Sequence, residues 1–218
     1  IRPAKPDFKA TLNGADPKVN AGSGKAFSVS VDRIDGFDGD ITVELTNVPS
    51  GFLVSTPLVV QAGHLEAKAS VHAAAEAPAA DTHTNAPSSP IQVTASALIE
   101  GQQVMDPVNN LGKITRLDPP KLYVALEPYD AQVTNFVERS ISDKPLEITI
   151  APGQSIPAWL KIKRNGHDDL VTFSVEGLPH GVIVDNIGLN GVLIPKGQDH
   201  RQIFLTAAKW VPEIDRLD

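Results

Sequence analysis

Apolar and polar residues alternate along much of this chain with a period of two. In one segment Phe27, Val29 and Val31 are separated by two serines. The same alternation recurs in four further segments, at 41–46, 91–97, 160–163 and 171–176. Such alternation gives a strand one buried face and one solvated face, as in an antiparallel sheet. The pattern therefore predicts an all-β fold of antiparallel strands.

Glycine and proline interrupt these segments often enough to leave little room for a long helix. The chain has 16 glycines and 18 prolines. The alanine-rich stretch 73–80 contains Pro78, and we expect a loop there because proline disrupts helical hydrogen bonding. Glu100–Gly101 separates the segments 91–97 and 102–108, which indicates a hairpin.

Two stretches of the chain share one pattern of strands and turns. The sequence ITVELTNVPSGFLVS at 41–55 aligns with VTFSVEGLPHGVIVD at 171–185, so that the Pro-x-Gly turn at 49–51 falls on the one at 179–181. The offset between the copies is 130 here, 131 before this stretch and 134 after it. It changes only in expected loops, where insertions are tolerated. We therefore predict two tandem copies of one module.

Each copy has the strand spacing of an immunoglobulin-like β-sandwich, in which about seven short strands are joined by turns. We predict one such domain at 1–118 and a second at 119–218. The two would be joined at Asp118–Lys121, where consecutive prolines stiffen the linker.

The second domain is predicted to be incomplete. At the offset of 134, the counterpart of Ile91, which opens the last hairpin of the first copy, would be residue 225, whereas the chain ends at Asp218. We therefore expect a fragment whose parent continues, with a second sandwich that lacks its last two strands. Because an open sheet edge invites pairing, we expect the apolar stretch 127–150, helped by a neighbouring chain, to cover it.

The segment RIDGFDGDITVELTNVPSGFLVSTPLVVQAG, residues 33–63, resembles the immunoglobulin-like modules of large exported bacterial proteins, of the type found beside pre-peptidase or glycosidase-associated domains. The resemblance covers both copies but rests on turn chemistry and strand phase, so it transfers no catalytic residue. It implies an extracytoplasmic setting, whether periplasmic, cell-surface or secreted. It also implies a role as a spacer, scaffold or adhesive unit.

Composition and charge exclude several functions. The formal net charge of −7 argues against nucleic acid, because phosphate binding needs clustered lysine and arginine. No apolar run approaches the ~18 residues that span a bilayer, so we expect no membrane insertion. The chain has no cysteine, which excludes disulfides and thiolate ligands. It begins at Ile1 and its single methionine is Met105, as expected of a processed or excised piece.

An acidic loop with Asp32, Asp35, Asp38 and Asp40 is the strongest metal candidate, because oxygen-rich loops suit calcium. The spacing does not match an EF-hand, and the second copy has the sequence NGHDD at 165–169 instead. Aspartate and glycine also form tight turns for backbone reasons alone. We favour a structural turn over a metal site and expect no cofactor.

No catalytic constellation is visible in the sequence. The segment Gly22–Lys25 lacks the remaining residues of a phosphate-binding loop, and no GxSxG serine motif is present. Carboxylates are plentiful, but the sequence pairs none of them across a cleft. None of the six histidines has a partner at zinc-ligand spacing: His64, His72, His83, His167, His180 and His200. We therefore expect no enzymatic activity.

The two tryptophans are the remaining candidates for ligand binding. Trp159 falls where the first copy has Ser28, and Trp210 falls where it has Glu76. If its neighbours face the core, Trp159 faces outward, where a ring can stack on a sugar. The alternative, which we favour, is that the segment 127–146, absent from the first copy, covers both rings, because large exposed apolar patches are uncommon in monomers.

These observations favour a non-enzymatic structural or interaction module of a larger exported bacterial protein. Its partners would be other domains of that protein or another protein. The alternative is a module that binds carbohydrate or another ligand through a surface aromatic or a loop.

Overall fold

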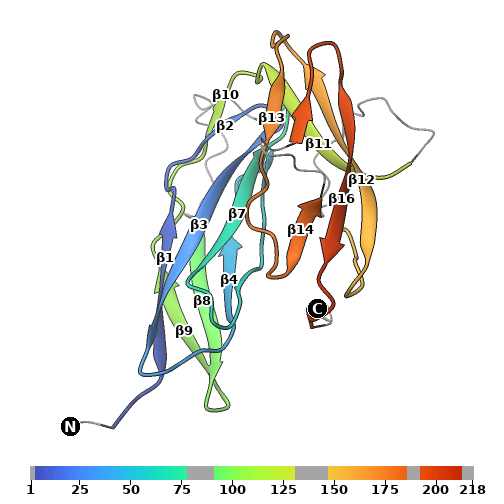
Figure 1. Ribbon diagram of the computed structural model, residues 1–218. Coiled ribbons are helices and arrows are strands. Elements are labelled where there is room, and N and C mark those ends of the chain that lie inside the picture. Colours follow the sequence, from blue (N-terminus) through green and yellow to red (C-terminus); the bar gives the residue numbers. More distant parts are fainter. Residues whose placement is uncertain (1–2, 78–90, 131–146, 186–191, 213–218) are drawn as a thin grey trace. The chain divides into compact units, whose positions relative to one another are not determined.

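The computed structural model describes four ranges of the chain, residues 3–77, 91–130, 147–185 and 192–212. Within them the chain forms strands and connecting turns and no helix, and so no helix that crosses a membrane (Figure 1). The predicted all-β fold of antiparallel sheets is confirmed. The chain divides into two compact units, here called unit 1 (residues 1–119) and unit 2 (residues 120–218).

Unit 1 is built from two four-stranded sheets. One has the order β1–β3–β7–β5, with strands at Asp7–Asn13, Ser23–Ile34, Glu66–Ala73 and Phe52–Val54. The other has the order β6–β4–β8–β9, with strands at Leu58–Val60, Ile41–Thr46, Gln92–Ile99 and Gln102–Val108. Every pairing within these two sheets is antiparallel.

The predicted hairpin is the pair β8–β9, and its turn explains the sequence there. Glu100 and Gly101 have φ values of 50° and 79°. A two-residue hairpin turn whose twist matches that of the strands requires positive φ at both positions. Glycine accepts this conformation without steric cost.

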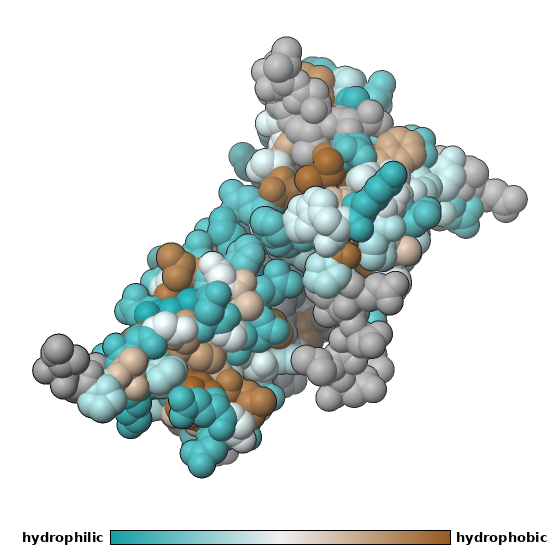
Figure 2. Space-filling view, turned by 60° about the horizontal axis from the view of Figure 1, so that its bottom comes forward, coloured by the Kyte–Doolittle hydropathy of each residue, from teal (hydrophilic) through white to brown (hydrophobic). Residues whose placement is uncertain are grey.

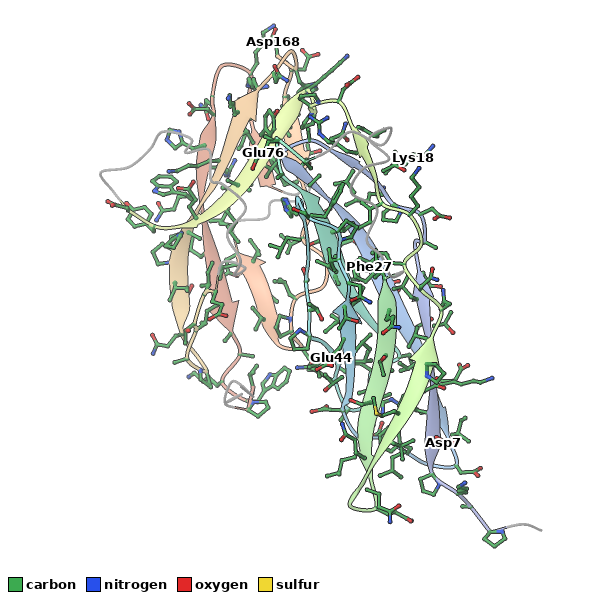
Figure 3. The ribbon with its side chains drawn as sticks, turned by 180° about the vertical axis from the view of Figure 1, so that it is seen from behind. Asp7, Lys18, Phe27, Glu44, Glu76 and Asp168 are labelled. Carbon is green, nitrogen blue, oxygen red and sulfur yellow. The ribbon has the colours of Figure 1, made fainter. Side chains whose placement is uncertain are left out.

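The core of unit 1 lies between the two sheets and is made by the alternating residues. Phe27 and Val29 of β3 and Val43 of β4 are at most 4% exposed, and Phe27 is labelled in Figure 3. Glu44, next to Val43, is on the solvent-facing row. Removal of these rows from water is the main driving force for forming the sandwich. On the face seen in Figure 2, hydrophobic residues form separate groups among hydrophilic ones.

One pairing in unit 1 was not expected. β2 (Lys18–Asn20) pairs in parallel with β10 (Thr115–Leu117). Alternation indicates strands but not the direction of a distant partner, and parallel strands require a long connection. Here the strands of both sheets lie between β2 and β10 in sequence. The pair joins the two ends of unit 1, and the Asn20 side chain donates to the carbonyl of Asp118 at 2.7 Å.

Unit 2 repeats one of these sheets and part of the other. Its larger sheet has the order β11–β12–β16–β14, with strands at Leu122–Pro128, Ser155–Arg164, His200–Ala207 and Val182–Asp185. Its smaller sheet is the antiparallel pair of β13 (Val171–Phe173) and β15 (Val192–Ile194). The buried core comprises Ala158, Leu160, Ile162, Val171, Val184, Ile194, Ile203 and Leu205.

Backbone hydrogen bonds of unit 1 recur in unit 2 at the three sequence offsets. The matching bonds are Gly22 N to Ala73 O and Gly153 N to Ala207 O, Ala74 N to Gly51 O and Ala208 N to Gly181 O, Phe52 N to Pro49 O and Val182 N to Pro179 O, and Val31 N to Leu65 O and Ile162 N to Asp199 O. The strands β1, β3, β4, β5, β6 and β7 therefore correspond to β11, β12, β13, β14, β15 and β16.

The hairpin β8–β9 has no counterpart among the described residues of unit 2. Of the stretch 127–150, which we expected to cover the open edge, residues 131–146 lie outside the described residues. Ile148 and Ile150 are partly buried against the core of unit 2.

Candidate functional site

The outer face of the large sheet of unit 2 carries the side chains that differ most from unit 1. Leu160 and Ile162 of β12 lie in the core. Because side chains alternate along a strand, Trp159 and Lys161 lie on the opposite face. The orientation predicted for Trp159 thus follows from the observed burial of its neighbours.

Trp159 is enclosed by a small group of side chains, here called the Trp159 cluster (Tyr129, Trp159 and His200). The Tyr129 ring stacks on the indole with centroids 5.1 Å apart and planes at 29°. The His200 ring meets it edge-on, also at 5.1 Å, with planes at 84°. The indole N–H donates to the backbone carbonyl of Asp130 at 2.9 Å. Trp159 is therefore engaged on several sides and is not an open stacking platform.

A buried ion pair lies beside this cluster. Lys161 Nζ and Glu127 Oε2 are 2.9 Å apart, and the two residues are 1% and 5% exposed. The other carboxylate oxygen, Oε1, is buried without a hydrogen-bond partner. In unit 1 the equivalent pair is Asn13 and Ser30, whose side chains form an exposed hydrogen bond of 3.1 Å. Unit 2 thus places a charged pair where unit 1 has a neutral contact at the surface.

Trp210 has a different environment. It is 62% exposed, and its nearest aromatic neighbour is His180, at a centroid distance of 5.0 Å. The expectation that the segment 127–146 covers both tryptophans is therefore wrong for Trp210. For Trp159, Tyr129 from that segment does provide cover.

The aspartates of the acidic loop are engaged separately. Asp38 and Asp40 each accept a backbone N–H from the turn 62–63, at 2.9 and 2.7 Å. Asp35 accepts a backbone N–H from the N-terminal segment at 3.0 Å, and Asp32 is exposed in β3. Among the described residues, no three His, Asp or Glu side chains gather as a metal site requires. The carboxylates of Asp38 and Asp40 hold a turn in place.

An arginine joins the turns at the same end of each unit. Arg33 donates through Nη1 to Gly39 O at 2.6 Å, through Nη2 to Gln61 O at 2.8 Å and through Nε to His64 O at 3.0 Å. The matching bonds of Arg164 go to Asp169 O at 2.7 Å, Pro195 O at 3.0 Å and Gln198 O at 3.2 and 3.3 Å. Asp168, labelled in Figure 3, lies in one of these turns. Sequence alignment pairs the two arginines but does not reveal their task, since a backbone carbonyl has no sequence signature.

The chain matches no family model and no curated protein. Among solved structures it is similar to domains 4 and 5 of the S-layer protein SbsC, with 17% identity, coverage of 51% of this chain and 54% of that chain, and a TM-score of 0.28. It is also similar to domains 5–6 of SbsC, with 14% identity, coverage of 94% and 86%, and a TM-score of 0.30. The D0–D1 domain of intimin has 13% identity, coverage of 93% and 84%, and a TM-score of 0.27.

The chain spans about half the length of the first of these structures. Identities and TM-scores this low transfer no role to it. None of the three is a pre-peptidase- or glycosidase-associated domain, so that finer resemblance stays an expectation.

Proposed function

We propose that this chain is a non-enzymatic structural and interaction module of a larger exported protein, in which sandwich units serve as spacers or scaffolds. The observation that supports the proposal is the use of its conspicuous polar groups. Arg33, Arg164, Asp38 and Asp40 all bind backbone groups of turns. Groups engaged in this way stabilise loops and are not free to act on a substrate.

Force spectroscopy of the full chain, held between two marker domains, tests the spacer role. A module of this kind should resist pulling and unfold in two steps, one for each unit. Each step should lengthen the chain by roughly 3.3–3.6 Å per residue released. Extension without a resolved unfolding force, or one step that releases the whole chain, would contradict the proposal.

A second candidate function is the binding of a carbohydrate at Trp210. The supporting observation is its 62% exposure on the Pro-x-Gly turn of unit 2, beside His180. An exposed indole offers an apolar face on which a sugar ring can stack. Titration of the intrinsic fluorescence with soluble glycans tests this function. The signal should change in the wild type and in Trp159→Phe but not in Trp210→Ala, and an unchanged signal in the wild type would exclude the glycans used.

A further inference from the structure

Unit 1 buries a row of aliphatic side chains along its edge strand β1. Phe8, Ala10 and Leu12 are 3%, 8% and 3% exposed. The row faces the interior of the sandwich because Ala10 pairs with Val31 and Leu12 pairs with Val29, and both valines are core residues of β3.

The equivalent row in unit 2 is open to solvent. Val124 of β11 pairs with Ile162, and Leu126 pairs with Leu160, so both face the same side as the core residues of β12. Yet Val124 is 51% exposed and Leu126 is 39% exposed. The core-facing side of β11 is therefore partly uncovered.

The smaller sheet of unit 2 differs from unit 1 in the same way. In unit 1, β4 is paired on one side with β6 and on the other with β8. In the described part of unit 2, β13 is paired with β15 alone, and it is three residues long where β4 has six. Leu45 of β4 is 4% exposed, whereas its counterpart Val175 is 42% exposed. An exposed strand edge and an exposed aliphatic row thus occur together.

In unit 1 a single element, the hairpin β8–β9, covers both of these surfaces. β8 pairs with β4, and β9 reaches the edge of β1, where Asp106 accepts the N–H of Ala10 at 3.2 Å. Asn109, just after β9, donates to Leu12 O and accepts from Leu12 N, both at 2.9 Å. The equivalent surfaces of unit 2 are shaped for the same element.

We propose that unit 2 is an acceptor for a β-hairpin supplied by a partner polypeptide. The first strand of the hairpin pairs with the open edge of β13, and the second covers Val124 and Leu126. The hairpin carries small or β-branched aliphatic residues at alternate positions and polar residues between them, as β8 does. The inference rests on the proposed role as an interaction module and gives that role a surface and a kind of partner.

The structure also argues against the chain's own hairpin as the occupant. In β8, Val93, Ala95 and Ala97 are 4%, 0% and 6% exposed, so they are already part of the core of unit 1. A second copy of the chain would have to open that core to offer its own β8–β9. The partner is therefore a separate segment with the same alternating pattern.

The probe for a test is the chain's own hairpin sequence, IQVTASALIEGQQVMDPV, residues 91–108. A second copy of it is joined to the C-terminus of the full chain through a flexible Gly/Ser linker, which gives it a high effective concentration at unit 2. The matched control carries aspartate in the appended copy in place of its two inward residues, corresponding to Val93→Asp and Ala95→Asp.

Amide hydrogen exchange then reports on the edge of β13. We expect amides at 171–175 to exchange roughly tenfold more slowly with the intact appended hairpin than with the aspartate control. The double variant Val124→Ser/Leu126→Ser should abolish that difference, whereas Leu65→Ser, at a site 63% exposed in unit 1, should leave it unchanged. All these positions are exposed, so the far-ultraviolet circular dichroism should stay the same.

Three results would overturn the acceptor proposal. The first is equal protection in the intact and aspartate fusions, which would mean that the chain already covers these surfaces or never accepts a hairpin. The second is protection that survives Val124→Ser/Leu126→Ser. The third is protection that rises with protein concentration in the chain without any appended hairpin, which would make a second copy the occupant. Two-step unfolding under force alongside any of these results would refute the acceptor alone and leave the spacer role intact.

Discussion

Arg33 and Arg164 occupy equivalent positions in the two units, and each guanidinium donates to three equivalent backbone carbonyls. Gly39, Gln61 and His64 accept from Arg33, and Asp169, Pro195 and Gln198 accept from Arg164. The planar fork of an arginine reaches several carbonyls at once, and the ammonium of a lysine cannot reproduce that geometry. Each arginine therefore fixes the turns at one end of its sandwich.

Replacement of either arginine by lysine should destabilise its own unit. Hydrogen bonds to a charged group contribute about 1.5–3 kcal/mol each, and lysine retains the charge but not the full set of bonds. We expect Arg33→Lys and Arg164→Lys each to lower the free energy of unfolding by about 1–3 kcal/mol in urea denaturation.

Arg201→Lys is the matched control for this prediction. Arg201 is exposed and makes one hydrogen bond, to Leu193 O at 2.8 Å. Its replacement should change the free energy of unfolding by no more than about 0.5 kcal/mol. Equal effects at Arg33, Arg164 and Arg201 would show that the backbone contacts contribute nothing beyond the charge.

Gly181→Ala should be more harmful than Gly197→Ala, although both glycines have positive φ, at 82° and 80°. A left-handed backbone costs a non-glycine residue roughly 1–2 kcal/mol, and this cost is common to both variants. A Cβ at Gly181 would also collide with Val211 and lie 2.8 Å from the Trp210 ring, whereas nothing lies within 4 Å of a Cβ at Gly197. Thermal melts of the two variants measure the difference, and equal melting temperatures would contradict the close packing of Trp210 on this turn.

The sequence predicts the strands well and the contacts on the outer face poorly. Alternation identifies β3 and β12, because their buried rows are uniformly apolar. The same rule assigns Lys161 to the solvent side, yet it is 1% exposed. Its burial depends on Glu127, a residue of another strand that faces it across the sheet, and alternation within one strand carries no information about such a partner. The exposure of Val124 likewise depends on which element covers β11.

Calcium should not change the stability of the chain. Asp38 and Asp40 already accept backbone N–H groups, so binding of an ion would have to compete with bonds that hold the turn at 62–63. A ligand present at 100 times its dissociation constant adds about 2.7 kcal/mol, which a thermal melt resolves. We expect identical melting temperatures with and without millimolar calcium.

The double variant Asp38→Asn/Asp40→Asn serves as the control for the calcium experiment. It should lower the melting temperature by the same amount in both conditions, because the loss concerns the backbone contacts. A rise with calcium in the wild type that this variant removes would establish a calcium site in the acidic loop.

Removal of one partner of the buried pair should cost more than removal of both. Lys161→Met leaves the Glu127 carboxylate buried without its cation, and breaking a buried pair in this way costs about 3–5 kcal/mol. Replacing both residues, as Glu127→Leu/Lys161→Met, also removes the buried oxygen that has no partner, and apolar replacement of a buried pair is often neutral or stabilising. We therefore expect the double variant to be more stable than Lys161→Met and close to the wild type, as measured by urea denaturation of all four proteins in the cycle. Additive losses would mean that the two charges do not depend on each other, and that other groups compensate each of them.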